Sequence, residues 1–345
     1  MIISNHNTDV AVFIIAELSA NHNGSLEIAL ETIRAVKRSG ADAIKLQTYT
    51  ADTITLDVNR EDFLIRGGTI WDGRRLYELY QEAHTPWEWH EELFKCAKEE
   101  GLICFSSPFD KTAVDFLEGL NTPAYKIASF EITDIPLIEY VASKGKPIIL
   151  STGIAGIDDI ELALDACRRM GNENIALLKC TSSYPAPVEE ANLVMISEFR
   201  DKFGVIPGLS DHTMGSVVPV VATSLGAKII EKHFILDKSI GGPDASFSMD
   251  EKEFTEMVIA IRSAEKAVGT ISFDLTEKQI SSRGFSRSLY ITTDIKKGTR
   301  LTKDNVRSIR PGYGMHPKYY SSVIGKSVNQ DVEKGTRLSF QILKA

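Results

Sequence analysis

The feature that most constrains the fold is a regular alternation of short β-branched runs with longer amphipathic stretches, which extends to residue 268. The apolar runs predict strands at 12–16, 43–47, 102–106, 124–127, 147–151, 175–179, 205–209 and 228–232. The amphipathic stretches predict helices at 26–38, 87–100, 111–118, 135–143, 157–170, 190–202, 215–225 and 250–268. This α/β alternation predicts a closed parallel (β/α)8 TIM barrel over 1–269. A doubly wound open sheet is the alternative, which is disfavoured because no Gly-x-Gly-x-x-Gly fingerprint follows the first strand.

The remainder of the chain predicts a linker and a second, smaller domain. Residues 270–284 are polar and predict the linker, whereas 285–345 predict a compact β-rich domain. That domain contains an internal sequence repeat: Asp-Ile-Lys-Lys-Gly-Thr-Arg-Leu-Thr at 294–302 and Asp-Val-Glu-Lys-Gly-Thr-Arg-Leu-Ser at 331–339. Two copies indicate internal pseudo-symmetry and not a solenoid, which needs more repeats.

The net charge of −8 conceals an asymmetry between the two parts. Residues 286–345 carry 12 Lys and Arg against 4 Asp and Glu, so the rest of the chain is strongly acidic. A basic tail is one signature of nucleic-acid binding. Here the aromatic and basic interleaving of a nucleic-acid platform is lacking. We therefore expect no nucleic-acid partner, and a basic domain that docks on an acidic surface near an anionic substrate.

Composition and apolar runs favour a cytoplasmic enzyme. No apolar run approaches the roughly 18–20 residues needed to cross a bilayer, so we expect no membrane association. The four cysteines form no Cys-x-x-Cys pair, which predicts buried thiols in a reducing compartment.

Polar residues at the predicted strand ends indicate an anion site, because barrel enzymes place function at the carboxyl ends of their strands. Two inward lysines are surrounded by hydroxyls, and this set suits a phosphate plus a carboxylate: Lys45, Lys126, Ser107, Ser129, Ser151 and Ser210. The competing interpretation is that each lysine merely pairs with a nearby glutamate.

Two histidines and one glutamate at strand ends are further candidates. His212 and His233 follow neighbouring strands, with Glu231 and Asp244 nearby, and predict a labile divalent-metal site. Glu17 ends the first strand as a candidate general base, although it could simply pair with Lys45.

These motifs together resemble the sialic acid synthase family over nearly the whole chain. The motifs that carry the resemblance lie at 15–24, 41–48, 107–110, 125–129, 150–153, 209–212, 231–234 and 242–244. The segment around the Arg-Pro-Gly run at 310–312 is similar to that family's antifreeze-like (SAF) domain. Within the family, the chain is most similar to the pseudaminic acid synthase branch, through 17–21, 46–50 and 71–89.

The resemblance implies condensation of phosphoenolpyruvate with 2,4-diacetamido-2,4,6-trideoxy-L-altrose and water, giving pseudaminic acid and phosphate. It implies catalytic Glu17, Lys45 and Arg310, with Mn2+ or Mg2+ on His212 and His233. It also implies substrate contacts from Gln47, Ser107, Lys126, Ser129, Ser151, Ser182, Tyr184, Ser210 and Asp244. Arg310 is expected to reach the active site of a neighbouring subunit in a domain-swapped homodimer.

Several alternatives remain open. The same reaction on N-acetylmannosamine would give N-acetylneuraminate. A 3-deoxy-sugar-acid synthase would need another phosphate site, and a non-catalytic sugar- or ice-binding protein would need no metal or phosphate release. Ser182 stands where the family often has an amide, and Ser107 where it often has threonine. Trp71, in the long insertion 48–86, either contacts the sugar or merely packs.

Overall fold

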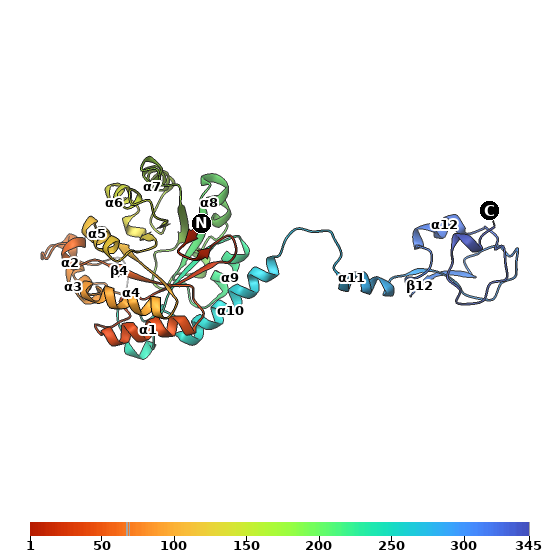
Figure 1. The fold of residues 1–345 in the computed structure, drawn as a ribbon, viewed down its shortest axis with the longest axis horizontal. Coiled ribbons are helices and arrows are strands. Elements are labelled where there is room, and N and C mark those ends of the chain that lie inside the picture. Colours follow the sequence, from red (N-terminus) through yellow and green to blue (C-terminus); the bar gives the residue numbers. More distant parts are fainter. Residues whose placement is uncertain (67, 69, 345) are drawn as a thin grey trace. The chain divides into compact units, whose positions relative to one another are not determined.

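The computed structural model describes residues 1–66, 68 and 70–344. The chain divides into two compact units, Met1–Gly269 and Thr270–Ala345. Helices and strands of both units are labelled in Figure 1. Among the described residues, no helix is long and apolar enough to cross a membrane. The four cysteines are buried and free of disulfides.

The first unit is built on eight parallel strands that close into a barrel, in the order β10-β3-β4-β5-β6-β7-β8-β9. The strands are β3 Phe13–Glu17, β4 Ala43–Thr48, β5 Ile103–Pro108, β6 Tyr125–Ile127, β7 Ile148–Ser151, β8 Ile175–Cys180, β9 Ile206–Asp211 and β10 Ile229–His233. Each lies within two residues of its predicted position at either end. The sequence-based prediction of a closed (β/α)8 barrel is confirmed.

Helices surround this barrel and bury an apolar stripe against it. The principal helices are α1 Leu26–Arg38, α4 His90–Glu99, α5 Lys111–Gly119, α6 Ile135–Ala142, α7 Ile157–Arg169, α8 Met195–Phe203, α9 Val217–Ser224 and α10 Glu251–Val268. Side-chain caps fix several starts: Ser25 accepts from the Ile28 N–H, and Asp250 forms a capping box with Glu253.

The largest error among the predicted helix starts lies at α8. We expected α8 to begin at residue 190, but it begins at Met195. A 3-10 turn, Val188–Glu190, precedes it, and Asn192 adopts a positive φ of 42°. A left-handed residue cannot continue a right-handed helix, so the helix starts only after it.

A two-stranded antiparallel hairpin, β1 Ile2–Ile3 with β2 His6–Asn7, precedes the barrel. Ile3 is fully buried in the cluster that fills the barrel interior, together with Phe13, Phe105 and Ile149. The hairpin therefore contributes to the packed core of the barrel, while the polar ends of the strands stay available at the other end.

The insertion 48–86 contains two helices, α2 Ala51–Ile54 and α3 Leu76–Ala83, after the end of β4. Tyr49 anchors it, with its ring 5.8 Å from Tyr80 and 5.0 Å from Phe109. A 3-10 turn, Trp87–Trp89, then leads into α4.

The second unit has its own apolar core, which includes Leu289, Val306 and Leu338. Its regular elements are α11 Glu277–Ser282, β11 Ser288–Ile291, β12 Val306–Ile309 and α12 Tyr320–Val323. The stretch expected to be a plain linker thus contains a short helix, which Thr276 caps with Gln279.

The repeated nonapeptides of this unit pair with one another. Ile295 and Val332 form an antiparallel bridge. The Asp331 carboxylate accepts from the Lys297 N–H at 2.8 Å, and the Asp294 carboxylate accepts from the Lys334 N–H at 2.7 Å. This reciprocal bonding is the internal pseudo-symmetry that the sequence repeat predicted.

Candidate active site

A cavity of about 510 Å³ opens at the carboxyl ends of the barrel strands. It collects most of the residues predicted from the sequence: Glu17, Lys45, Gln47, Lys126, Ser129, Ser151, Ser182, Tyr184, Ser210, His212, His233 and Asp244. Ser107, on β5, is buried but does not line the cavity, and Arg310 belongs to the other unit. Strands far apart in the sequence thus bring one set of polar groups together.

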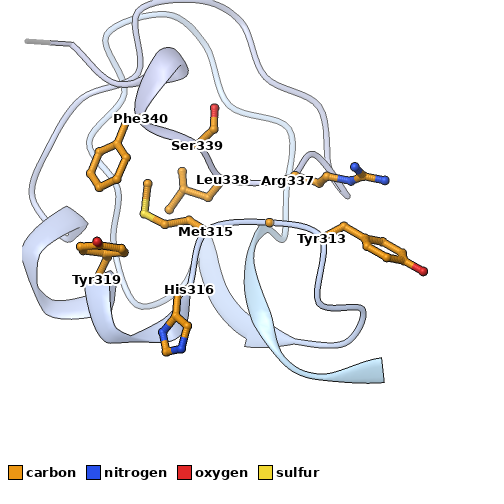
Figure 2. A pocket seen from close by; sticks show the side chains of 9 residues that line it. Tyr313, Met315, His316, Tyr319, Arg337, Leu338, Ser339 and Phe340 are labelled. Atoms are coloured by element: carbon orange, nitrogen blue, oxygen red, sulfur yellow. The ribbon is translucent and has the colours of Figure 1, made fainter. Parts of the chain in front are cut away.

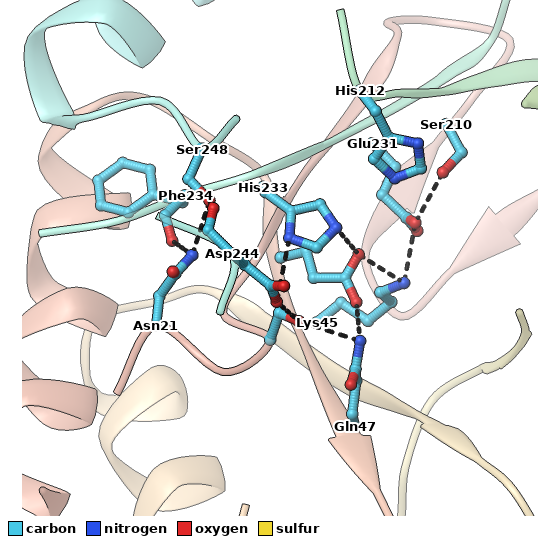
Figure 3. A network of polar contacts seen from close by, with 12 residues as sticks. Asn21, Lys45, Gln47, Ser210, His212, Glu231, His233, Phe234, Asp244 and Ser248 are labelled. Atoms are coloured by element: carbon cyan, nitrogen blue, oxygen red, sulfur yellow. Dashed lines mark hydrogen bonds and ion pairs between the residues drawn. The ribbon is translucent and has the colours of Figure 1, made fainter. Parts of the chain in front are cut away.

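A buried ion network occupies the floor of the cavity (Figure 3). Lys45 Nζ lies 2.8 Å from Glu231 Oε1 and 3.1 Å from Glu17 Oε2. Lys126 Nζ lies 3.5 Å from the same Glu231 oxygen. The glutamate pairing that competed with the anion site is therefore present, but it occurs inside the cavity, where the pairs can also face a ligand.

The network sets the charges of its members. Burial alone would raise the pKa of Glu17, but Lys45, His233 and Lys126 hold it well below its usual range. Burial likewise opposes a charged Glu231, yet the two lysines keep the pKa of its carboxyl low. Both carboxylates are therefore anionic at neutral pH.

Two serine hydroxyls of the predicted anion site lack any partner in the protein. The Oγ atoms of Ser107 and Ser151 are buried without a hydrogen bond, and so is Glu231 Oε2. Buried polar atoms are normally paired, so the orphaned hydroxyl of Ser151, which lines the cavity, indicates a group that awaits a ligand. By contrast, Ser210 donates to Glu231 Oε1 at 3.2 Å.

Gly153 allows the serines to converge. Its N–H donates to Ser129 Oγ at 3.1 Å. A Cβ at this position would lie 2.0 Å from Ser182 Oγ and 2.7 Å from Ser129 Oγ. Only glycine leaves room for both hydroxyls.

His212 follows β9 and His233 ends the neighbouring strand β10, and the centroids of their rings lie 5.3 Å apart. His212 Nδ1 donates to the carbonyl of Thr181 at 3.1 Å, so Nε2 is the ring nitrogen left to face a ligand. Burial opposes a charged His212, but the hydrogen bond with Cys180 outweighs it and raises the pKa of the ring. Burial lowers the pKa of His233, and its Nδ1 has no hydrogen bond. Among the described residues, no cluster of three or more His, Cys, Asp or Glu could hold a metal.

Asp244 and Gln47 link the two histidines to Glu17. Asp244 Oδ2 lies 3.8 Å from His233 Nδ1 and accepts from Ser19 Oγ at 2.5 Å. Gln47 donates to Glu17 Oε1 at 2.8 Å. Glu17 Oε2 lies 3.3 Å from His233 Nε2, so the carboxylate bridges the lysine and histidine halves of the site.

A scan of the chain against family models matches residues 32–272 to the NeuB family and 286–341 to the SAF domain. The chain belongs to the NeuB family. It is 51% identical over 338 residues to pseudaminic acid synthase of Campylobacter jejuni subsp. jejuni serotype O:23/36, with 98% of each chain covered. It is 50% identical to pseudaminic acid synthase of Helicobacter pylori, covering 94% of this chain and 96% of the relative.

A crystal structure of the same family has the same fold. The spore coat polysaccharide biosynthesis protein of Bacillus subtilis matches with a TM-score of 0.68 at 32% identity, covering 100% of this chain and 99% of its own. The predicted resemblance to the sialic acid synthase family, and the order of barrel and SAF domain, are confirmed.

Two ionisable residues of this NeuB-family site were not among the predicted ones. Burial raises the pKa of Glu131 to about 7, and its Oε2 is buried without a hydrogen bond. Burial opposes ionisation of Cys180, but a hydrogen bond with His212 outweighs it and lowers the thiol pKa to about 7. Glu131 follows a strand end, which was the available sequence signal, but its burial was not predictable.

The SAF domain carries a hollow of its own, of about 500 Å³. Figure 2 shows Tyr313 and Arg337 at one side of it and Tyr319 with Phe340 at another. The Arg337 guanidinium lies 4.9 Å from the Tyr313 ring centroid. Arg310 is outside this hollow and precedes a cis peptide bond to Pro311.

Proposed function

We propose that this chain condenses phosphoenolpyruvate with 2,4-diacetamido-2,4,6-trideoxy-L-altrose and water, giving pseudaminic acid and phosphate. The observation that carries the proposal is the meeting of two buried lysines with the orphaned hydroxyl of Ser151 at a barrel mouth. Similarity to pseudaminic acid synthases over 98% of the chain supports the choice of sugar.

Phosphoenolpyruvate occupies the lysine side of the cavity. Lys45 and Lys126 supply positive charge to its phosphate and carboxylate, and the hydroxyl of Ser151 donates a hydrogen bond that it lacks in the free protein. Because Glu17 and Glu231 already balance the lysines, the incoming anion draws the lysines partly away from these partners.

Carbon 3 of phosphoenolpyruvate attacks the sugar aldehyde, and positive charge develops at carbon 2. Glu17 stays ionised, so its carboxylate stabilises that cation more effectively than it accepts protons. Glu131, with a pKa of about 7, is the better carrier of a proton at neutral pH. Water then adds at carbon 2, and the phosphate leaves with cleavage of its bond to carbon.

The two histidines suit a divalent ion, Mn2+ or Mg2+. His212 Nε2 and the orphaned His233 Nδ1 would hold the ion. When bound, such an ion would supply Lewis-acid polarisation of the aldehyde oxygen. Asp244, through Ser19 and His233, orients this side of the cavity.

Arg310 of the SAF domain completes the site of a neighbouring subunit, where it contacts the acetamido group of the sugar. The basic SAF domain and the acidic barrel are of opposite charge, which favours such an assembly. Mixing Arg310→Ala subunits with Lys45→Met subunits should restore activity above either alone. No gain after subunit exchange would place Arg310 on its own barrel instead.

The proposal is tested by phosphate release from phosphoenolpyruvate with Mn2+ present. The altrose sugar is compared with N-acetylmannosamine at equal concentration. Release with the altrose sugar alone supports the proposed substrate. Release with N-acetylmannosamine alone keeps the condensation and replaces the sugar, and release with neither contradicts the proposal.

A further inference from the structure

The described part of the insertion 48–86 spans the mouth of the barrel. In the closed order of strands, β4 and β8 are four strands apart in both directions, and therefore lie opposite each other. Trp71, which follows β4, has its ring 5.4 Å from the ring of Tyr184, which follows β8. The Trp71 indole N–H donates to the Pro243 carbonyl at 3.2 Å, beyond β10. The described part of the insertion is thus a roof held on both sides.

The face of this roof that lines the cavity is apolar. Apart from Ala83, the lining side chains that it contributes are Tyr49, Ile54, Ile65, Trp71, Leu76, Leu79 and Tyr80. Phe109 and Phe247 extend the apolar surface from the neighbouring loops. The strand ends opposite supply the lysines, the carboxylates and the histidines. The cavity therefore has one charged half and one apolar half.

This division orients the sugar. Its aldehyde carbon must lie near phosphoenolpyruvate and the two histidines, in the charged half, for a bond to form. The opposite end of the sugar then faces the roof. Against Trp71 and the aliphatic side chains of the roof, a hydroxyl would lose water without gaining a partner, whereas a methyl group would bury apolar surface.

We propose that the roof, with Trp71 at its centre, is the subsite for the methyl-bearing end of the amino sugar. Trp71 and the Tyr184 ring beside it hold the carbon-6 methyl and the acetamido methyl at carbon 4. Trp71 is therefore a specificity-determining residue that selects 6-deoxy sugars over sugars with a carbon-6 hydroxyl. This inference rests on the proposed function for the identity of the aldehyde.

The test compares the 6-deoxy sugar with 2,4-diacetamido-2,4-dideoxy-L-altrose, which restores the hydroxyl at carbon 6. Trp71→Ala should lower kcat/KM for the 6-deoxy sugar about 10- to 100-fold and for the hydroxylated sugar much less. In this variant the ratio of kcat/KM between the two sugars should approach one, and the KM for phosphoenolpyruvate should be unchanged. Trp89→Ala is the matched control, because Trp89 is half-buried and outside the cavity lining, and its ratio should equal that of the wild type.

Saturation-transfer NMR of the 6-deoxy sugar, without phosphoenolpyruvate, gives a readout that needs no turnover. The carbon-6 methyl should receive strong saturation in the wild type and in Trp89→Ala, and weak saturation in Trp71→Ala. Two results would overturn this inference and leave the proposed function intact. One is turnover without saturation of the carbon-6 methyl, and the other is an equal loss of kcat/KM for both sugars in Trp71→Ala. Methyl contact without turnover leaves the subsite in place and contradicts the proposed function.

Discussion

Glu231 Oε1 lies 2.8 Å from Lys45 Nζ, and both side chains are only 2% exposed. Their strands are not neighbours, because β3 lies between β4 and β10 in the barrel. Two charges removed from water in this way are costly unless each keeps its partner. The pair therefore serves folding and ligand binding together, and the two roles can be separated by mutation.

Lys45→Met should destabilise the protein by about 3–5 kcal/mol, because Glu231 would lose its nearest cation while remaining buried. Adding Glu231→Met should recover most of that loss. Phosphoenolpyruvate binding should stay absent in both variants. Urea unfolding and calorimetric titration measure the two effects. A double variant that regains the ligand would show that Lys45 acts only through stability.

Gly153→Ala should weaken phosphoenolpyruvate binding, because its Cβ would displace Ser182 and Ser129. We expect a loss of about 1–3 kcal/mol in stability as well, as for other overpacked sites. Gly156→Ala is the control in the same loop: its nearest neighbour, Asp159, is 3.6 Å from the added Cβ. Equal KM values for phosphoenolpyruvate in the two variants would contradict the crowding argument.

Because the pKa of Glu131 is raised, we expect the free energy of unfolding to fall as the pH rises. Its folded-state pKa of about 7 exceeds the ordinary 4.5, so the folded protein binds the extra proton between these values. Stability should be full below pH 4.5, decline towards pH 7 and stay low above it. Glu131→Gln should remove this decline, which is on the order of 1–3 kcal/mol. Parallel unfolding curves for the wild type and the variant at pH 5 and pH 8 would refute the raised pKa.

Replacing both His212 and His233 with alanine should abolish stimulation by Mn2+ and the binding of the ion. Chelation with EDTA should inactivate the wild type and should not lower the activity of the double variant any further. The matched control is His90→Ala, because His90 is a buried histidine that bonds Thr48 and lies outside the cavity lining. Activity that EDTA still suppresses in the double variant would locate the metal elsewhere.

The barrel and most of its polar mouth were predictable from the sequence because two periodicities act together. β-branched runs located the strands, and alternation along β4 placed Lys45 and Gln47 on one face. The β1–β2 hairpin was missed because strands of two residues show no periodicity. The helix α11 was also missed, although Thr276 and Gln279 form a recognisable capping box.

The remaining features of the site depend on tertiary packing. Nothing near Glu131 in the sequence reports how deeply its carboxyl is buried, and burial is what raises its pKa. The contact between Trp71 and Tyr184 crosses the barrel between loops more than a hundred residues apart. The sequence indicated the insertion and its aromatics, but only the closed barrel shows which loops they meet.

The central claim is a condensation in which phosphate departs with the bridging oxygen of phosphoenolpyruvate. The most direct measurement uses phosphoenolpyruvate labelled with oxygen-18 at that bridge, the diacetamido altrose sugar and Mn2+, with products analysed by mass spectrometry and NMR. We predict unlabelled pseudaminic acid and labelled phosphate in equal amounts. Label retained in the sugar acid, or phosphate formed without a nonulosonic acid, would contradict the account.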